Sequence, residues 1–343
     1  MGDFDFRRII SKLVSLQDLT EEEAAETYSA LAEGRLTEGQ VGALIIAERM
    51  KGASVSELTG FTKTMRRRAA SKDHGFQLLD TCGTGADAIK TFNISTATIF
   101  ILAAGGVKIG KHGVGAITSR SGSADVLAAL GANIQLNIDQ VVECIEKVGI
   151  GFAFVPRVHS TSEHVRKVRQ EVGIGSLFNL IGPMSNPLLP SMQIMGVYSP
   201  EYAPKMAEVI ARLGCQRGFV LYGEGGLDEA STLGCTYVWE IADGKVTESV
   251  IAPEQFGLKR ARPEDLLCRD AKESARMIGE IFAGERGPRR DIVVLNAAFG
   301  FVAAGKAKDV KGGIALAEAE IDSGRAARKL EEFVAFTKSL PQS

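Results

Sequence analysis

The spacing of apolar residues changes near residue 73, and this change limits what the chain can fold into. Before about residue 70, apolar residues recur three and four positions apart, as in Ile9, Ile10 and Leu13, which is the spacing of amphipathic helices. After residue 74, short apolar runs end in glycine-containing turns that open into helical segments. This alternation of strand, loop and helix is typical of an α/β domain with a largely parallel sheet.

Two domains are therefore expected. The first is a small all-helical domain over residues 1–73, and helices from about residues 166–190 are candidates to join it. The second is a larger α/β domain over residues 74–343, with a central, largely parallel sheet. A length of 343 residues agrees with this division, because single cores seldom grow beyond about 250–300 residues. Ligands of such sheets bind at the carboxyl ends of the strands.

Charge and cysteine usage exclude several classes of protein. A net charge of −2 gives no overall attraction to nucleic acid or to an anionic membrane. The five cysteines are widely spaced and form no CxxC pair, so neither a disulfide framework nor a zinc site is indicated. No apolar run approaches the roughly 18 residues of a membrane helix. We expect a cytoplasmic protein with no nucleic-acid partner and no membrane partner.

Residues 82–96, the first anion site, contain the most informative stretch of the sequence. Gly83 and Gly85 flank a threonine and allow backbone N–H groups to approach an anion closely. Hydrogen-bonding side chains stand at the start of the following apolar helix, where the helix dipole favours negative charge: Asn93, Ser95 and Thr96. The stretch has neither the P-loop pattern nor the dinucleotide pattern. The alternative is a strand-to-helix turn capped by Asn93 or Ser95.

Residues 111–125, the second anion site, combine two cations, several hydroxyl groups and a glycine before another helical run. Lys111, Arg120 and Ser123 are the side chains most suited to an anion. The alternative is a solvated polar loop in which Ser123 caps a helix. Two anion sites in one domain predict a ligand with separated phosphates.

Residues 225–231, the acidic loop, place two adjacent carboxylates after a pair of glycines. Asp228 and Glu229 have no histidine or cysteine nearby, and such a set suits Mg²⁺ better than zinc. The alternative is that both residues form the acidic first turn of a helix.

Together, these three segments resemble the anthranilate phosphoribosyltransferases, which belong to glycosyltransferase family 3 and share the class II nucleoside phosphorylase fold. The resemblance extends, in the same order, to residues 178–183, 186–187, 196–200, 296–298 and 321–324. It implies a Mg²⁺-dependent transfer of the 5-phosphoribosyl group from phosphoribosyl pyrophosphate to the amine of anthranilate, a step of tryptophan biosynthesis. It also implies a homodimer, which the apolar helical amino end would suit.

The resemblance also implies roles for individual residues. Those expected to bind the donor are Gly83, Gly85, Asp87, Asn93, Ser95, Thr96, Lys111, Ser119 and Ser123. Those expected to reach the metal are Ser95, Asp228 and Glu229. Those expected at the acceptor are Val114, His159, Arg169 and Gly182, with Arg169 facing the carboxylate of anthranilate. No general base is assigned, because an aromatic amine needs placement near the ribose C1 atom more than deprotonation.

The sequence departs from the family pattern mainly on the acceptor side. Val114 and Gly115 replace an asparagine and an arginine, residues 160–162 replace Pro-Ala-Met, and Gly175 replaces another arginine. Three alternatives are therefore kept. They are a paralogue of the same fold with a different aromatic acceptor, a nucleoside phosphorylase, and a non-catalytic paralogue that binds nucleic acid.

Overall fold

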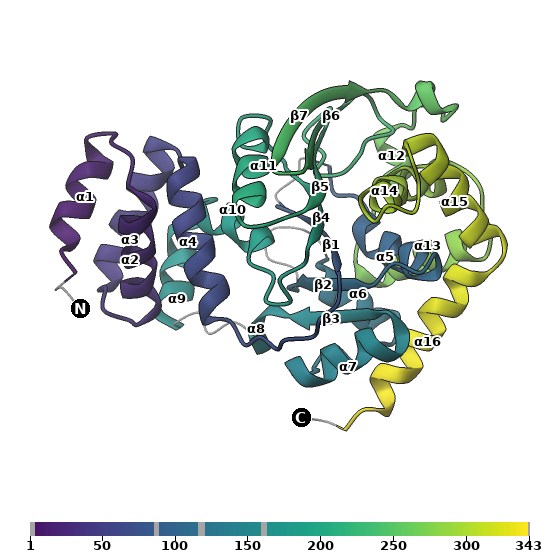
Figure 1. The fold of residues 1–343 in the computed structure, drawn as a ribbon, viewed down its shortest axis with the longest axis horizontal. Helices are drawn as coiled ribbons and strands as arrows, with labels where there is room; N and C mark the ends of the chain where they lie inside the picture. The colour runs from purple at the N-terminus through teal and green to yellow at the C-terminus, as the bar shows by residue number, and fades with distance from the viewer. Residues whose placement is uncertain (1–3, 86–88, 116–120, 159–162, 342–343) are drawn as a thin grey trace.

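The computed structural model describes residues 4–85, 89–115, 121–158 and 163–341 (Figure 1). Its amino-terminal part is helical, as the sequence predicts: α1 (Phe6–Val14), α2 (Glu21–Ala32), α3 (Glu38–Lys51) and α4 (Val55–Arg68). The capping boxes expected at Thr20 and Thr37 are both formed, and Ser54 forms a third at the start of α4. Each box pairs helix N–H groups that would otherwise lack partners.

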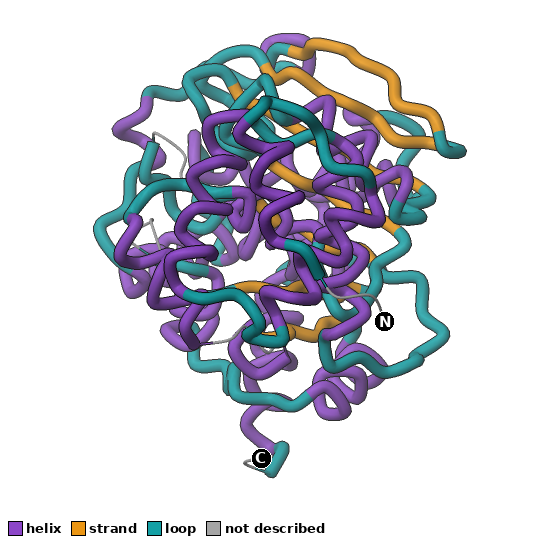
Figure 2. Tube along the Cα trace, turned by 90° about the vertical axis from the view of Figure 1, so that its left-hand side faces the viewer, coloured by secondary structure: helices purple, strands orange, loops and turns teal. Residues whose placement is uncertain are grey.

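The α/β part contains a seven-stranded sheet with the order β3-β2-β1-β4-β5-β6-β7. The parallel strands are β1 (Leu79–Gly83), β2 (Ile109–Gly113), β3 (Ile150–Phe154), β4 (Met192–Gly196) and β5 (Arg217–Gly223). The antiparallel strands are β6 (Thr236–Ala242) and β7 (Lys245–Ile251), which form the hairpin at the upper edge of the view in Figure 2. A largely parallel sheet is thus confirmed. The strand order reverses between β1 and β4, which is where such sheets bind ligands.

One face of the sheet packs against a helical layer on the right of Figure 1. This layer contains α5 (Ile94–Ala104), α6 (Ser123–Ala129), α13 (Ala271–Phe282), α14 (Pro288–Ala303), α15 (Val310–Asp322) and α16 (Arg325–Ser339). The break predicted at Ser323 and Gly324 separates α15 from α16, because Gly324 takes the left-handed conformation with a φ of 72°. Short elements and α7 complete this part of the chain: α7 (Ile138–Val148), α8 (Val155–Val158), a 3₁₀ turn (Pro253–Phe256) and α12 (Pro263–Leu266).

The other face of the sheet packs against α10 (Leu177–Met184) and α11 (Ala203–Arg212). These helices share one apolar core with α1 to α4 and with α9 (Glu163–Val172). Figure 1 places α10 between α4 and the sheet, so this helix lies where the helical part meets the α/β part. Within the described ranges, every helix is too short or too polar to cross a bilayer.

Candidate active site

A pocket of about 320 Å³ lies at the carboxyl ends of β1 and β2. The loops that follow these strands line one side of it, and α9 and α10 line the other. Tyr28 of α2 and Met65 of α4 also contribute, so the pocket lies between the helical part and the sheet. Its position at the strand-order reversal is that of a ligand site in an open α/β sheet.

Asp228 lies against the ends of the two central strands, β1 and β4. Its Oδ2 atom accepts a hydrogen bond of 2.8 Å from the backbone N–H of Gly85. A Cβ atom on Gly83 would lie 2.3 Å from this same oxygen, and a Cβ atom on Gly196 would lie 1.5 Å from the Asp228 carbonyl oxygen. Only glycine fits at these two paired positions. The acidic loop is therefore held directly on the sheet.

The second carboxylate of the acidic loop reaches the start of α5. Glu229 Oε1 accepts a hydrogen bond of 3.1 Å from the backbone N–H of Ser95. This N–H belongs to the first turn of the helix, where a negative charge is stabilised by the helix dipole. Asp228 and Glu229 thus bring negative charge to the loop after β1, at Gly85, and to the start of α5, at Ser95.

The acidic loop is not the first turn of a helix, so that alternative is wrong. The segment following Leu227 is irregular, and its backbone is held by a buried side chain of α14. Asn296 Oδ1 accepts from the N–H of Ala230 at 2.9 Å, and Asn296 Nδ2 donates to the Ala230 carbonyl at 2.9 Å. These two bonds satisfy backbone groups that a helix would have paired internally.

Lys111 brings a cation to the same place from β2. Its side chain is buried, and its Nζ atom donates to the Thr81 carbonyl and lies 3.4 Å from Ser95 Oγ. Burial raises the pKa of Asp228, while the Gly85 N–H, Lys90 and Lys111 oppose that rise. A bound cation would relieve the cost of burying this carboxylate beside Glu229.

Asn93 joins the two anion sites. It precedes α5 but makes no side-chain cap to that helix, so capping of α5 by Asn93 is not formed. Its Oδ1 atom accepts instead from Ser121 Oγ at 2.7 Å and from Ser274 Oγ at 3.1 Å. Asn93 thereby fixes the distance between the loops after β1 and β2.

Ser123 is the first residue of α6, and Gly122 holds the cap position, so the alternative in which Ser123 caps the helix is also wrong. A Cβ atom on Gly113 would lie 2.1 Å from Ser123 Oγ. The Val114 carbonyl accepts from the N–H of Ala124 at 3.2 Å, and Val114 lines the pocket.

The side of the pocket where the acceptor is expected is lined by α9 and α10. The guanidinium carbon of Arg169 lies 4.7 Å from the centroid of the Phe178 ring, a cation–π contact. Burial is the main cause that lowers the pKa of Arg169. A Cβ atom on Gly182 would meet no atom within 4 Å, so the pocket is open at this residue.

The predicted site residues fall into three groups. Those that line the pocket are Gly83, Gly85, Asn93, Ser95, Lys111, Val114, Ser123, Arg169, Gly182, Asp228 and Glu229. Thr96 does not line it, because this residue lies buried inside α5. Asp87, Ser119 and His159 lie outside the described residues. Tyr28, Met65 and Asn179 line the pocket but were missed, since a side chain on an amphipathic helix carries no sequence signal for a ligand.

Comparison with known proteins agrees with this geometry. The helical bundle domain of the glycosyl transferase family matches residues 7–69, and its a/b domain matches residues 75–327. The anthranilate phosphoribosyltransferase of Acetivibrio thermocellus is 46% identical over 334 residues, which cover 97% of each chain.

Solved structures give the same result. The Thermus thermophilus anthranilate phosphoribosyltransferase superposes with a TM-score of 0.90 at 40% identity, covering 96% of this chain and 99% of that one. The Saccharomyces cerevisiae enzyme in complex with PRPP and Mg superposes with a TM-score of 0.89 at 29% identity, covering 99% of both chains.

Proposed function

The chain belongs to the anthranilate phosphoribosyltransferases of the glycosyl transferase family, and we propose that its pocket transfers the 5-phosphoribosyl group of phosphoribosyl pyrophosphate to the amine of anthranilate. Pyrophosphate is the second product, and the reaction is a step of tryptophan biosynthesis. The observation that supports this assignment most is that Asp228 and Glu229 accept from the N–H groups of Gly85 and Ser95 while Lys111 reaches the Ser95 hydroxyl group in the same pocket. Such a set of charges and donors suits a phosphorylated donor and its metal.

The donor set fits Mg²⁺ rather than a metal held by protein ligands alone. No group of three metal-ligating side chains occurs in the described part of the chain. Two carboxylates and the Ser95 hydroxyl leave coordination positions for substrate phosphates, which is the usual way that proteins bind Mg²⁺. The raised pKa of Asp228 also indicates a carboxylate whose charge needs a partner. When bound, the ion would neutralise negative charge on the pyrophosphate group.

We assign the leaving-group side of the reaction to the two anion sites. As the bond between ribose C1 and pyrophosphate breaks, negative charge grows on the phosphate oxygens and positive charge grows on the ribose. The Lys111 ammonium, which lines the pocket beside the Ser95 hydroxyl group, would stabilise the departing phosphates. Ser123, at the start of α6, would bind the pyrophosphate from the second anion site.

The acceptor side would bind and orient anthranilate without a general base. Arg169 can hold a carboxylate through two parallel hydrogen bonds, and its guanidinium group lies against the Phe178 ring. The amine of the acceptor then needs only a position close to ribose C1. Val114 offers no hydrogen bond where the family pattern has asparagine, so Arg169 would carry most of the recognition.

A pyrophosphate-release assay tests this function. The purified chain is given phosphoribosyl pyrophosphate, Mg²⁺ and, one at a time, anthranilate, other aromatic acids and aromatic amines without a carboxylate. We expect release with anthranilate and much slower release with the amines. A second mixture holds a pyrimidine nucleoside and phosphate, and nucleoside cleavage there without pyrophosphate release in the first would favour a phosphorylase instead.

We further propose that two copies of the chain associate through the helical part. Four apolar side chains are exposed on two helices that pack together, Val14 and Leu16 at or just after the end of α1 and Ile46 and Met50 on α3. An apolar surface of this kind favours an interface with a second copy. Met50→Glu is expected to convert a dimer into a monomer in analytical ultracentrifugation.

The remaining assignments are also proposals. We place the domain boundary near residue 73, with α9 and α10 joined to the helical part because they share its apolar core. We place the reaction in the cytoplasm, where thiols are reduced, since none of the five cysteines forms a disulfide. We keep Asp87, Ser119 and Thr96 as predicted donor residues and His159 as a predicted acceptor residue.

A further inference from the structure

The carboxyl end of α10 has an unusual set of hydrogen-bond partners. The last carbonyl groups of a helix have no N–H partner within it. In α10 four successive carbonyls accept from side chains. The pairs are Ile181 O with Ser185 Oγ at 2.6 Å, Gly182 O with His112 Nε2 at 3.0 Å, Pro183 O with Gln193 Nε2 at 3.0 Å, and Met184 O with Arg66 Nε at 2.7 Å.

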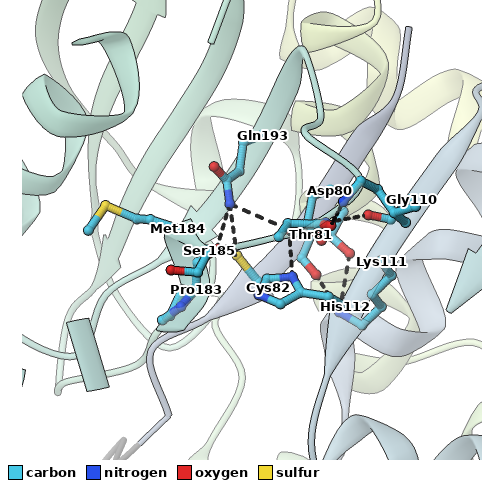
Figure 3. A network of polar contacts seen from close by, with 12 residues as sticks. Asp80, Thr81, Cys82, Gly110, Lys111, His112, Pro183, Met184, Ser185 and Gln193 are labelled. Carbon is cyan, nitrogen blue, oxygen red and sulfur yellow. Dashed lines mark hydrogen bonds and ion pairs between the residues drawn. The ribbon is translucent and has the colours of Figure 1, made fainter. Parts of the chain in front are cut away.

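Ser185 directly follows α10, and the other three donors come from distant elements. His112 belongs to β2, Gln193 to β4 and Arg66 to α4 of the helical part. Figure 3 shows Gln193 and His112 converging on the turn that contains Pro183. The end of α10 is therefore tied both to the sheet and to the helical part.

Burial makes these contacts costly to lose. His112 and Gln193 are only 6% and 2% exposed. Arg66 is partly buried, and burial is the main cause that lowers the pKa of its guanidinium group. A buried carbonyl without its donor costs more free energy than the same bond at a surface.

The neighbours of His112 determine which of its ring nitrogens donates a hydrogen bond. Its Nδ1 atom lies 3.0 Å from Asp80 Oδ2, and its Nε2 atom lies 3.0 Å from the Gly182 carbonyl oxygen. A carbonyl can only accept, so Nε2 must carry a proton. The Nε2–H group of His112 therefore donates to α10. Gln193 Nε2 also lies 3.5 Å from Asp80 Oδ2, which links the two donors.

The end of α10 determines one side of the pocket. Phe178, Asn179, Gly182 and Pro183 line the pocket, and Arg169 stacks on Phe178. The donor side is built from the ends of β1 and β2. A shift of α10 along its axis would change the distance between the acceptor side and the donor side. Displacements of about 1 Å between reacting groups can cost about a hundredfold in rate.

We propose that Gln193 and Arg66 are positioning residues for the acceptor, although neither lines the pocket. They act through the carbonyls of Pro183 and Met184 and hold α10 at the distance that places the acceptor amine on ribose C1. This inference rests on the proposed function, because it assumes that α9 and α10 bind the acceptor.

The test compares Gln193→Leu and Arg66→Met with matched controls. Gln140 is a buried glutamine of α7 that does not line the pocket. Its amide donates to the carbonyl of Pro341 at 2.8 Å, and Gln140→Leu removes this bond. Arg289→Met removes another guanidinium that donates to a backbone carbonyl, that of Asp265 at 3.2 Å. Each variant is assayed for the KM of anthranilate, the KM of phosphoribosyl pyrophosphate, kcat and Tm.

For Gln193→Leu and Arg66→Met we expect kcat/KM for anthranilate to fall at least about three- to tenfold, which is the effect of losing one hydrogen bond. The KM of phosphoribosyl pyrophosphate should stay within about twofold of the wild-type value. Both control variants should keep the wild-type kcat/KM for anthranilate and the wild-type KM of phosphoribosyl pyrophosphate. Arg66→Lys should recover part of the loss and also serves if Arg66→Met does not fold.

The outcomes separate this inference from the proposed function. An active wild-type protein whose Gln193→Leu and Arg66→Met variants keep the wild-type kcat/KM for anthranilate would overturn the positioning role alone. An equal rise in the Michaelis constants of both substrates would show a general effect on stability. So would a Gln140→Leu variant that loses as much kcat/KM for anthranilate as Gln193→Leu, and either result would also overturn the positioning role. An inactive wild-type protein would contradict the proposed function and, with it, the acceptor role of α10.

Discussion

The backbone N–H of Gly85 donates a hydrogen bond of 2.8 Å to Oδ2 of Asp228, a residue 143 positions later in the chain. This bond joins the first anion site to the acidic loop. Because Gly83 and Gly196 lie directly against Asp228, the carboxylate has one position relative to β1 and β4. The geometry of the proposed metal site thus depends on two glycines as much as on the carboxylates.

Gly83→Ala is expected to disturb the metal site. The added Cβ atom would lie 2.3 Å from Asp228 Oδ2, so the carboxylate must move by about 1 Å, and such a displacement can lower kcat about a hundredfold. The apparent affinity for Mg²⁺ should fall as well. Initial rates measured over a range of Mg²⁺ concentrations would give both values.

Gly279→Ala is the control for this change. Gly279 lies in α13, and a Cβ atom there meets no atom within 4 Å. Alanine is the better helix former, so this variant should gain about 0.5–1 kcal/mol of stability and keep its activity. If Gly83→Ala behaves like Gly279→Ala, the close contact with Asp228 has no role in catalysis.

Arg169→Ala is expected to remove the use of carboxylate acceptors. A bidentate pair between arginine and a carboxylate is stronger than an ordinary hydrogen bond, so the KM of anthranilate should rise at least about tenfold. Gln170→Ala, a change at an exposed neighbour on α9, is the control and should leave that KM unchanged. An unchanged KM in Arg169→Ala would remove the residue from the acceptor site.

Val114→Asn is expected to improve the use of anthranilate. Asparagine adds donors and an acceptor at a position that lines the pocket, and one hydrogen bond contributes about 0.5–1.5 kcal/mol. The KM of anthranilate should therefore fall severalfold with kcat unchanged. A rise in this KM would indicate that Val114 contacts a different acceptor.

Glu48 is expected to make stability depend on pH. This residue of α3 is 2% exposed, and neither carboxylate oxygen has a hydrogen-bond partner among the described residues. Burial, and then the nearby charges of Glu57 and Asp18, raise the pKa of Glu48 to about 8, against the opposing charge of Lys51.

The sign of the effect follows from that rise. The folded state favours the protonated form, so the contribution of Glu48 is fully present below the usual pKa of 4.5. It is lost as the pH rises toward the folded pKa of about 8, and the loss levels off above it. Urea unfolding of wild type and Glu48→Gln from pH 5 to 9 would measure it, with a slope of at most about 1.4 kcal/mol per pH unit. The exposed Glu22→Gln is the control, and parallel curves for Glu48→Gln and wild type would contradict the prediction.

The general fold could be predicted from the sequence because its signals are local. The capping residues Thr20 and Thr37 mark helix starts by contacts with residues three positions away. The order of strands depends on contacts between distant segments, and nothing in the sequence near Leu79 indicates that β1 pairs with both β2 and β4.

The candidate site could be predicted in part for the same reason. Gly83, Lys111 and Asp228 belong to polar or glycine-rich stretches, which differ from a hydrophobic core. Thr96 was included because it stands at a helix start, yet the helix turns its side chain into the core. Asn296 and Gln193 donate to distant backbone carbonyls. Asn296 belongs to a stretch that carries the family resemblance, and Gln193 stood out only as a polar residue within an apolar run.

The most direct test of the proposed site is the rate of anthranilate consumption by wild type and by Asp228→Asn with Glu229→Gln. With phosphoribosyl pyrophosphate and Mg²⁺, the wild type should convert anthranilate and release one pyrophosphate per turnover. The double variant should fold, because amides can still accept from the N–H groups of Gly85 and Ser95, and its kcat should fall at least about a hundredfold. A double variant that retains near-normal, Mg²⁺-dependent turnover would contradict the assignment of the metal and the donor to this site.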